Sequence, residues 1–321
     1  MLKLLRTHIL PIYILVVLTL ATGISTTNNA YAARKDELKV LRVGVLYNHP
    51  IAENEKSIAE FSNFYATQLG LKVEVIRFKS LGSLMDAHGS ARVQYAIHSA
   101  RSYATMNEIC SCLHAIARPI SAQGSNGFRS VLIIRDDKKA DYANGEKLRI
   151  GFSRKNSMSG WLVPNKAIEN GDIPANDFLE LGSVEDVVSA YERGNVDGYF
   201  GWVPTSKLDE VVSSEKVFGT IYNSRLQAEK KSTIVWRSKI IHHGPHVAHR
   251  SLPKELVEDL TNLLLNMSSR SPEVLDIIEP YFSGGFEQAN VGDYNAISAV
   301  LNLSSISVPA IIDGRLRSTL Q

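Results

Sequence analysis

The sequence predicts an α/β protein of two lobes, the first built around a parallel sheet. Short apolar runs rich in β-branched residues alternate with stretches of helical periodicity, an order that produces parallel strands joined by helices. The alternation starts afresh after a charged turn that follows Arg135. About 290 residues follow the first 32, and this length suits two lobes of ordinary size better than one small core.

The first alternating series begins with a short apolar run at residues 41–46, which we interpret as a buried strand. Apolar residues then recur at helical spacing as far as Gly70, and glycine is typical of a helix C-terminus. A strand at 73–78, a short helix at 81–88 and a strand at 93–98 complete this series. Strand, helix and strand in this order predict the first parallel sheet.

A strongly apolar strand at 130–135 precedes the charged turn, and the second series opens with the strand at 148–152. Its amphipathic helix at 184–193 ends at Gly194, again a residue typical of helix C-termini. The expected elements, in order, are strands at 130–135 and 148–152, helices at 161–169 and 184–193, and strands at 196–202 and 233–236. A strand at 246–248 and helices at 254–267 and 274–278 follow, whereas residues 304–321 form a tail with little pattern.

The first 32 residues have the order of a cleavable signal peptide. Lys3 and Arg6 precede an apolar run of about 14 residues, which is shorter than the ~20 of a membrane-spanning helix. Small residues at Ala30 and Ala32 flank a cleavage site before Ala33. No cysteine stands at that site, so we expect a free mature protein in the periplasm, without a lipid anchor.

Removal of the first 32 residues leaves 33 Lys and Arg against 33 Asp and Glu. A near-neutral chain has no global field that steers it to nucleic acid or to anionic lipid. We therefore expect no nucleic-acid partner, and any anion must be recognised locally.

Cysteine and histidine offer an alternative interpretation as a metal site. Cys110 and Cys112 could form a disulfide with each other, pair between chains, or remain buried thiols. Four histidines crowd residues 242–249, but no HExxH helix is present and no carboxylate lies within a few residues of them. We expect no metal, no cofactor and no catalytic residue, and a nucleophilic-serine enzyme is disfavoured because no G-x-S-x-G sequence surrounds the candidate serines.

Several short sequence motifs occur in a characteristic order along the chain. They are Arg42-Val43-Gly44-Val45, Tyr103, the run 127–135, Ser157-Met158-Ser159-Gly160-Trp161-Leu162-Val163-Pro164, Gly194-Asn195-Val196-Asp197, Gly244-Pro245, Leu252-Pro253, Gly285-Phe286 and Asp293-Tyr294. In these motifs the chain resembles the substrate-binding proteins of phosphate, phosphite and phosphonate ABC importers, a branch of the type II periplasmic binding proteins. The resemblance spans nearly all of residues 41–300.

The resemblance implies a two-lobed fold in which the chain crosses twice between lobes, near Arg135 and near Trp236. Lobe one would combine residues 33–135 with 237–303, and lobe two would hold residues 136–236. The implied function is that of a monomeric receptor that closes its lobes on a small anionic solute and presents it to the permease subunits of an ABC importer. An alternative with the same fold is a sensor subunit that signals to a membrane kinase.

The most informative stretch for ligand binding lies just after the strand at 148–152. Pro164 is best tolerated in a first helical turn, which places the helix start close to Ser159 and Gly160. Free N–H groups, the helix dipole and the hydroxyls of Ser157 and Ser159 can hold an oxyanion without a lysine. The alternative is a purely structural role, in which these serines only cap a helix. The resemblance implies that Ser157, Met158, Ser159 and Gly160 contact the anion.

The resemblance also places ligand contacts in lobe one and at the end of the second series. Arg101 is not expected from the family pattern; it could grip a phosphonate, phosphate or carboxylate with two hydrogen bonds, or be an ordinary surface arginine. Trp202 could stack on the ligand, or pack in the core or hinge. The remaining candidates are Tyr47, Ser99, Ser102, Tyr103 and Asp197.

Three positions depart from the family pattern. Leu81 stands where phosphonate binders carry Tyr, Val184 where they carry His, and Met158 where they carry Thr. Each change removes a polar contact to the ligand. We therefore expect a solute that is larger, less charged or more apolar than a simple phosphonate.

Overall fold

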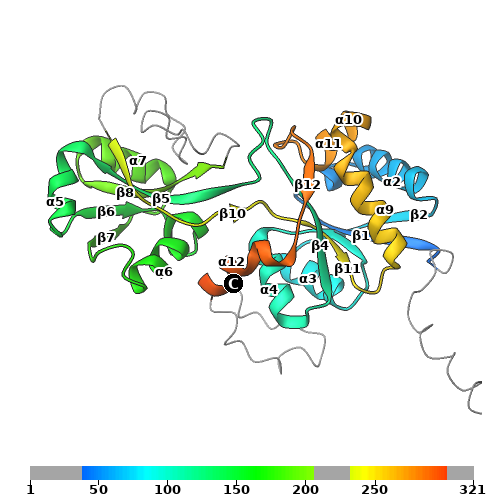
Figure 1. Ribbon diagram of the computed structural model, residues 1–321. Coiled ribbons are helices and arrows are strands. Elements are labelled where there is room, and N and C mark those ends of the chain that lie inside the picture. Colours follow the sequence, from blue (N-terminus) through cyan, green and yellow to red (C-terminus); the bar gives the residue numbers. More distant parts are fainter. Residues whose placement is uncertain (1–37, 206–231, 302–321) are drawn as a thin grey trace, which may run out of the picture.

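The protein folds into two lobes, each built around a six-stranded sheet (Figure 1). The computed structural model describes residues 38–205 and 232–301. The expected signal peptide at 1–32 and the expected tail at 304–321 lie outside these residues. No helix within the described part of the chain is long and apolar enough to cross a membrane.

Lobe one is assembled from both ends of the described chain. Its strands lie in the order β12-β4-β11-β3-β1-β2, in which β1, β2 and β3 are parallel and β11 runs antiparallel to its neighbours β3 and β4. The strands are β1 (Val40–Leu46), β2 (Lys72–Phe78), β3 (Tyr95–Ile97), β4 (Leu113–Pro119), β11 (His246–His249) and β12 (Phe286–Gln288). The apolar runs of the first series supply its buried strands, as the sequence predicts.

Helices cover both faces of the lobe-one sheet. One face packs α2 and α9 over a core that includes Leu41, Tyr65 and Leu260, and the other packs α3, α4 and α12. The helices and short helical turns are η2 (Pro50–Ala52), α2 (Glu55–Leu69), α3 (Leu81–Gly89), α4 (Ala100–Cys110), α9 (Lys254–Leu265), α10 (Met267–Arg270), α11 (Pro272–Ile278), η6 (Val291–Tyr294) and α12 (Asn295–Val300). Gly70 ends α2 with φ of 69°, a left-handed conformation that glycine adopts without strain.

Lobe two has its own sheet, in the order β10-β5-β8-β6-β7, with β9 paired to β5. Its strands are β5 (Gly127–Arg135), β6 (Arg149–Phe152), β7 (Asp177–Glu180), β8 (Gly198–Pro204), β9 (Ser232–Arg237) and β10 (Ile241–His242). Its helical elements are η3 (Asp136–Lys138), α5 (Lys139–Ala143), η4 (Met158–Leu162), α6 (Val163–Glu169) and α7 (Val184–Arg193). Gly194 ends α7 in the left-handed region, as expected.

The chain passes between the lobes at two places, and neither is where the sequence predicts it, near Arg135 and near Trp236. Strand β5 pairs with β8, β9 and β10 along its length, so the first crossing precedes residue 127. Strand β10 still belongs to lobe two and β11 to lobe one, so the second crossing lies between residues 242 and 246. An apolar run predicts a strand but not the sheet it joins, because pairing partners are distant in sequence.

The second crossing packs tightly against lobe one at Gly244. A Cβ atom at this position would lie 2.2 Å from the carbonyl oxygen of His98 and 2.9 Å from the Cα of Ser99. Only glycine fits this close backbone approach. The crossing segment therefore touches the point where β3 ends and α4 begins.

Candidate functional site

The serine-rich stretch after β6 forms a compact seat at a helix start. Ser157 is the N-cap of η4, and its hydroxyl accepts a hydrogen bond from the Gly160 amide at 3.1 Å. The amides of Trp161 and Leu162 both donate to the Ser157 carbonyl. The N–H groups of Met158 and Ser159 lie in the first turn, where a helix has no internal acceptor for them. Since η4 continues directly into α6, the positive end of a longer helical dipole lies at this turn.

Strand β5 holds this turn in place. The hydroxyl of Ser130, a fully buried residue, donates to the Ser159 carbonyl at 2.6 Å. That contact engages the Ser159 carbonyl and leaves the Ser159 amide and hydroxyl out of the hydrogen bond to β5. The seat is thus fixed to the central strand of lobe two and not only to its own loop.

A small cavity of about 30 Å³ opens at the seat. Its lining is Ser153, Ser157, Ser159, Gly160, Val184, Val187 and Phe200. A Cβ atom on Gly160 would lie 2.8 Å from the Ser157 hydroxyl oxygen and 3.1 Å from that of Ser153, so a larger residue would have to displace these hydroxyls. The cavity has room for a group of about one water molecule in size, such as one part of an oxyanion. No cationic side chain lines it.

The departures from the family pattern have distinct places in the structure. Val184 lines the cavity itself, at the start of α7. Leu81 is 42% exposed at the start of α3 in lobe one. Met158 is half-buried and, with Val163, packs against the hydrophobic cluster that contains Tyr294 and Ile297 of lobe one. All three positions are apolar, and Met158 brings the seat into contact with lobe one.

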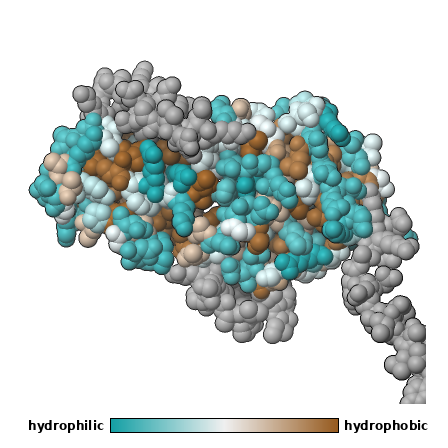
Figure 2. Space-filling model, viewed as in Figure 1, coloured by the Kyte–Doolittle hydropathy of each residue, from teal (hydrophilic) through white to brown (hydrophobic). Residues whose placement is uncertain are grey.

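The lobe-one candidates gather at the carboxyl edge of its parallel strands. Tyr47 directly follows β1, is 50% exposed, and has the Arg77 guanidinium 5.3 Å from its ring centre. Ser99 follows β3 as the exposed N-cap of α4, and Arg101 is exposed in the first turn of that helix. Ligands of open α/β sheets bind at this edge. The surface in Figure 2 has hydrophobic side chains where the lobes meet, among hydrophilic ones.

Behind Ser99 lies a chain of buried polar side chains. The Ser99 hydroxyl accepts the Ser102 amide at 3.1 Å and lies 2.9 Å from the Ser102 hydroxyl. The Ser102 hydroxyl donates to the Ser99 carbonyl at 3.0 Å and lies 3.3 Å from Nδ1 of His98. Nε2 of His98 is in turn 2.9 Å from Nδ1 of His88. Sequence reasoning missed both histidines, because residues 88 and 98 carry no motif.

Burial keeps both histidines neutral. It lowers the pKa of His98 to about 4. Burial, followed by the proximity of His98 and His249, also lowers the pKa of His88 well below its ordinary value. A neutral imidazole has one donor and one acceptor nitrogen, so each ring can give only one hydrogen to the chain.

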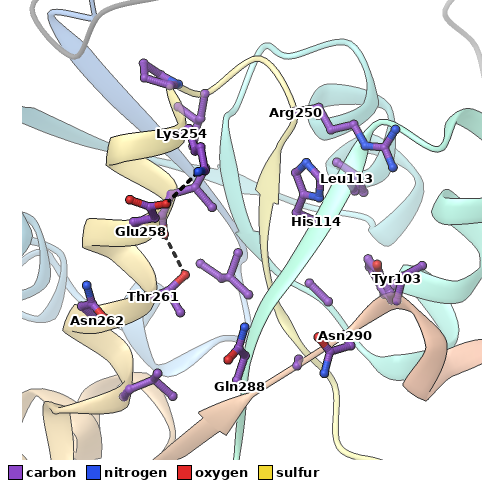
Figure 3. Close-up of a pocket in the computed structure, with 18 of the residues that line it drawn as sticks. Tyr103, Leu113, His114, Arg250, Lys254, Glu258, Thr261, Asn262, Gln288 and Asn290 are labelled. Carbon is purple, nitrogen blue, oxygen red and sulfur yellow. Dashed lines mark hydrogen bonds and ion pairs between the residues drawn. The ribbon is translucent and has the colours of Figure 1, made fainter. Parts of the chain in front are cut away.

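The structure does not bring Tyr103 to the seat. Its side chain is fully buried, packs at 4.9 Å from the Tyr294 ring, and lines a groove of about 1190 Å³ on lobe one (Figure 3). The hydroxyl lies near the Ala115 backbone without a hydrogen bond of normal geometry among the described residues. Burial raises the pKa of Tyr103. The groove lies between α9, β4 and α4, whereas lobe-two residues alone line the seat's cavity.

Asp197 and Trp202 have different relations to the seat. Asp197 precedes β8, at the opposite end of the parallel β6–β8 pair, where Arg149 contacts its two carboxylate oxygens at 2.7 and 3.0 Å. Burial alone would raise the pKa of Asp197, but hydrogen bonds from Arg149 hold it below its ordinary value. Trp202 shares a strand face with Phe200, which lines the cavity, and packs on Phe128 at 5.8 Å.

The histidines and cysteines of the alternative interpretation do not form a metal cluster among residues 38–205 and 232–301. Cys110 and Cys112 form a disulfide with each other. His243 contacts the Pro119 carbonyl, His246 contacts Tyr95 and Glu279, and His249 contacts Ser251. These side chains thus take part in separate contacts within lobe one.

The family described as "ABC transporter, phosphonate, periplasmic substrate-binding protein" matches residues 43–294. The chain belongs to this family. Its members are substrate-binding components of periplasmic ABC transport and not enzymes, in agreement with the sequence analysis.

Individual relatives are distant from this binding protein. The phosphonates-binding periplasmic protein of Escherichia coli (strain K12) is 24% identical over 169 residues, which are 51% of this chain and 47% of that protein. The aligned region thus spans about half the length of that curated relative. XAC2383 from Xanthomonas citri, solved bound to ATP, is 16% identical with a TM-score of 0.54, over 83% of this chain and 98% of that one. A binding protein of an ABC phosphonate transporter from Pseudomonas aeruginosa is 20% identical with a TM-score of 0.45, over 82% and 85% of the chains. The likeness to XAC2383 supports the two-lobed fold alone.

Proposed function

We propose that this protein is the periplasmic receptor of an ABC importer for a small organic solute that carries an oxyanion. The observation that carries the proposal is the seat formed by Ser157, Ser159 and Gly160 at the start of η4. Amide and hydroxyl donors converge there on a cavity, at the positive end of a helix.

The mode of anion recognition follows from the charges around the seat. Because no cation lines the cavity, the anion would be held by hydrogen bonds and by the helix dipole. Arg101 is exposed at the carboxyl edge of lobe one and would add the cationic contact when the lobes close. Closure would bring the Ser99 and Tyr47 edge against the seat, with β5 and the 242–246 segment as the hinge.

The apolar positions define the kind of solute. Val184 in the cavity lining cannot hydrogen-bond a phosphonate oxygen, and exposed Leu81 offers an apolar surface in lobe one. The E. coli relative is named for binding phosphonates, and the X. citri protein was solved bound to ATP. A phosphonate or phosphate monoester with an apolar or extended substituent fits these features better than inorganic phosphate.

Titration calorimetry of the Ser157→Ala/Ser159→Ala variant tests this function. Methylphosphonate, phenylphosphonate and inorganic phosphate serve as probes, and the exposed Ser269→Ala variant is the matched control. We expect phenylphosphonate to bind the wild type most tightly and the double variant at least tenfold more weakly, since hydrogen bonds to charged groups are strong. A ligand at 100 times its Kd should stabilise the wild type by about 2.7 kcal/mol. Unchanged affinity in a folded double variant would remove the seat from the site.

The cleavable signal peptide and the monomeric state are part of the same proposal. Export would place the mature chain between two membranes, where a freely diffusing receptor can meet a permease. Amino-terminal sequencing of the exported protein is expected to begin at Ala33, and light scattering to give the mass of one chain.

A further inference from the structure

Ser102 stands at the junction of the hydrogen-bonded chain behind Ser99, and it has a single hydroxyl hydrogen. We assign that hydrogen to the Ser99 carbonyl at 3.0 Å, because this carbonyl oxygen can only accept, whereas the Ser99 hydroxyl and Nδ1 of His98 can each donate to Ser102. At the 3.3 Å contact with His98, the Ser102 oxygen must therefore accept, so Nδ1 of His98 carries a hydrogen. Neutral His98 then has a bare Nε2, which accepts from Nδ1 of His88 at 2.9 Å.

The hydroxyl hydrogen of Ser99, in contrast, has two possible acceptors. The Ser99 oxygen already accepts the Ser102 amide, and the hydroxyl hydrogen can go either to the Ser102 oxygen at 2.9 Å or to a ligand. Ser102 is 2% exposed and has no access to water as a substitute donor. If Ser99 turned its hydrogen to a ligand and His98 were absent, the buried Ser102 oxygen would lose both of its side-chain donors.

We propose that His98, oriented by His88, is a positioning residue that frees the Ser99 hydroxyl to donate to an oxyanion. The donor from His98 keeps the Ser102 oxygen paired while the Ser99 hydrogen moves to the ligand. Donors then run in one direction, from His88 through His98 and Ser102, and chains of this kind polarise one another. This inference rests on the proposed function, since it assigns Ser99 as the lobe-one contact of the bound anion.

The surroundings of the pair favour this role. His88 and His98 are 0% and 3% exposed, and their rings lie edge to edge and nearly coplanar, with ring centres 5.2 Å apart and an interplanar angle of 8°. Nε2 of His88 faces the Gln94 backbone but makes no hydrogen bond of normal geometry among the described residues.

Nitrogen-15 NMR of the ligand-free protein at pH 7.5 tests the direction of the donors. We expect His88 and His98 both to be neutral, with the hydrogen on Nδ1, and to keep that form when methylphosphonate or phenylphosphonate is added. The reverse arrangement, with the hydrogen on Nε2 and His88 turned to the Gln94 carbonyl, would overturn the inference. This readout needs no ligand, so it decides the inference even if neither probe binds and the proposed function fails.

A double-mutant cycle with phenylphosphonate tests the consequence for binding. Ser99→Ala and His98→Leu are each expected to weaken binding about tenfold, and the double variant no more than Ser99→Ala alone. His98→Asn places an amide donor near the position of Nδ1 and should restore affinity to within about threefold of the wild type. Additive losses, or a His98→Leu loss that His98→Asn does not rescue in an equally stable protein, would contradict the inference.

Discussion

Acid should destabilise this protein through His98, and the size of the effect follows from its burial. The side chain is 3% exposed, and its pKa is lowered from 6.5 to about 4. The unfolded chain therefore takes up a proton first, so stability falls as the pH drops through 6.5 toward 4 and then levels off. Between pH 7.5 and pH 5, this one group should remove about 2 kcal/mol of unfolding free energy.

Urea unfolding of the wild type and of His98→Asn at both pH values measures this contribution. Protonation of other buried histidines also destabilises the protein in acid. The informative quantity is therefore the difference between the two proteins in the unfolding free energy that each loses between pH 7.5 and pH 5. The variant should lose about 2 kcal/mol less than the wild type between pH 7.5 and pH 5. Equal losses in the two proteins would refute the reasoning, because His98 would then titrate alike in the folded and unfolded chains.

Three substitutions probe other parts of the molecule. Gly160→Ala should displace the Ser157 hydroxyl and weaken phenylphosphonate binding at least tenfold in calorimetry. Gly292→Ala, which has open space around it, is the control and should leave the affinity unchanged. Equal affinities of these two variants would exclude the proposed geometry of the seat. Arg118→Ala leaves Glu287 and Asp293 without their buried partner and should cost about 3 kcal/mol in urea unfolding, and a loss below about 1 kcal/mol would contradict this. Asp197→Asn should lower the free energy of unfolding by only about 1 kcal/mol, because its partner Arg149 is half-exposed. Ligand affinity should not change, and weakened binding would assign Asp197 to the site.

Local sequence signals predicted much of the fold. The glycines that end α2 and α7 both adopt the left-handed conformation, and the apolar runs of both series lie in buried strands. Strand β4 escaped prediction because it follows a cysteine-containing turn and has no regular alternation. The sheet to which β5 belongs also could not be predicted, since its partners in β8 and β9 come much later in the chain.

The candidate site was predictable only where one short segment supplies it. Ser157, Ser159 and Gly160 are neighbours in sequence, and a helix start alone makes them converge. The partner of Asp197 is Arg149, 48 residues away, and periodicity could not indicate that pair. The buried contacts of His88 and His98 likewise depend on how α3 packs beside β1 and α4, which no local pattern encodes.

The close fit of Gly244 against His98 and Ser99 has a mechanical consequence. The segment that crosses between the lobes and the residues that end β3 share one backbone contact, with no room for a side chain between them. The proposed rotation of lobe two would therefore pull on the residues that position the Ser99 hydroxyl. In the proposed closure this pivot would also respond to the bound solute, so a bulky side chain at position 244 would uncouple solute capture from the change of shape.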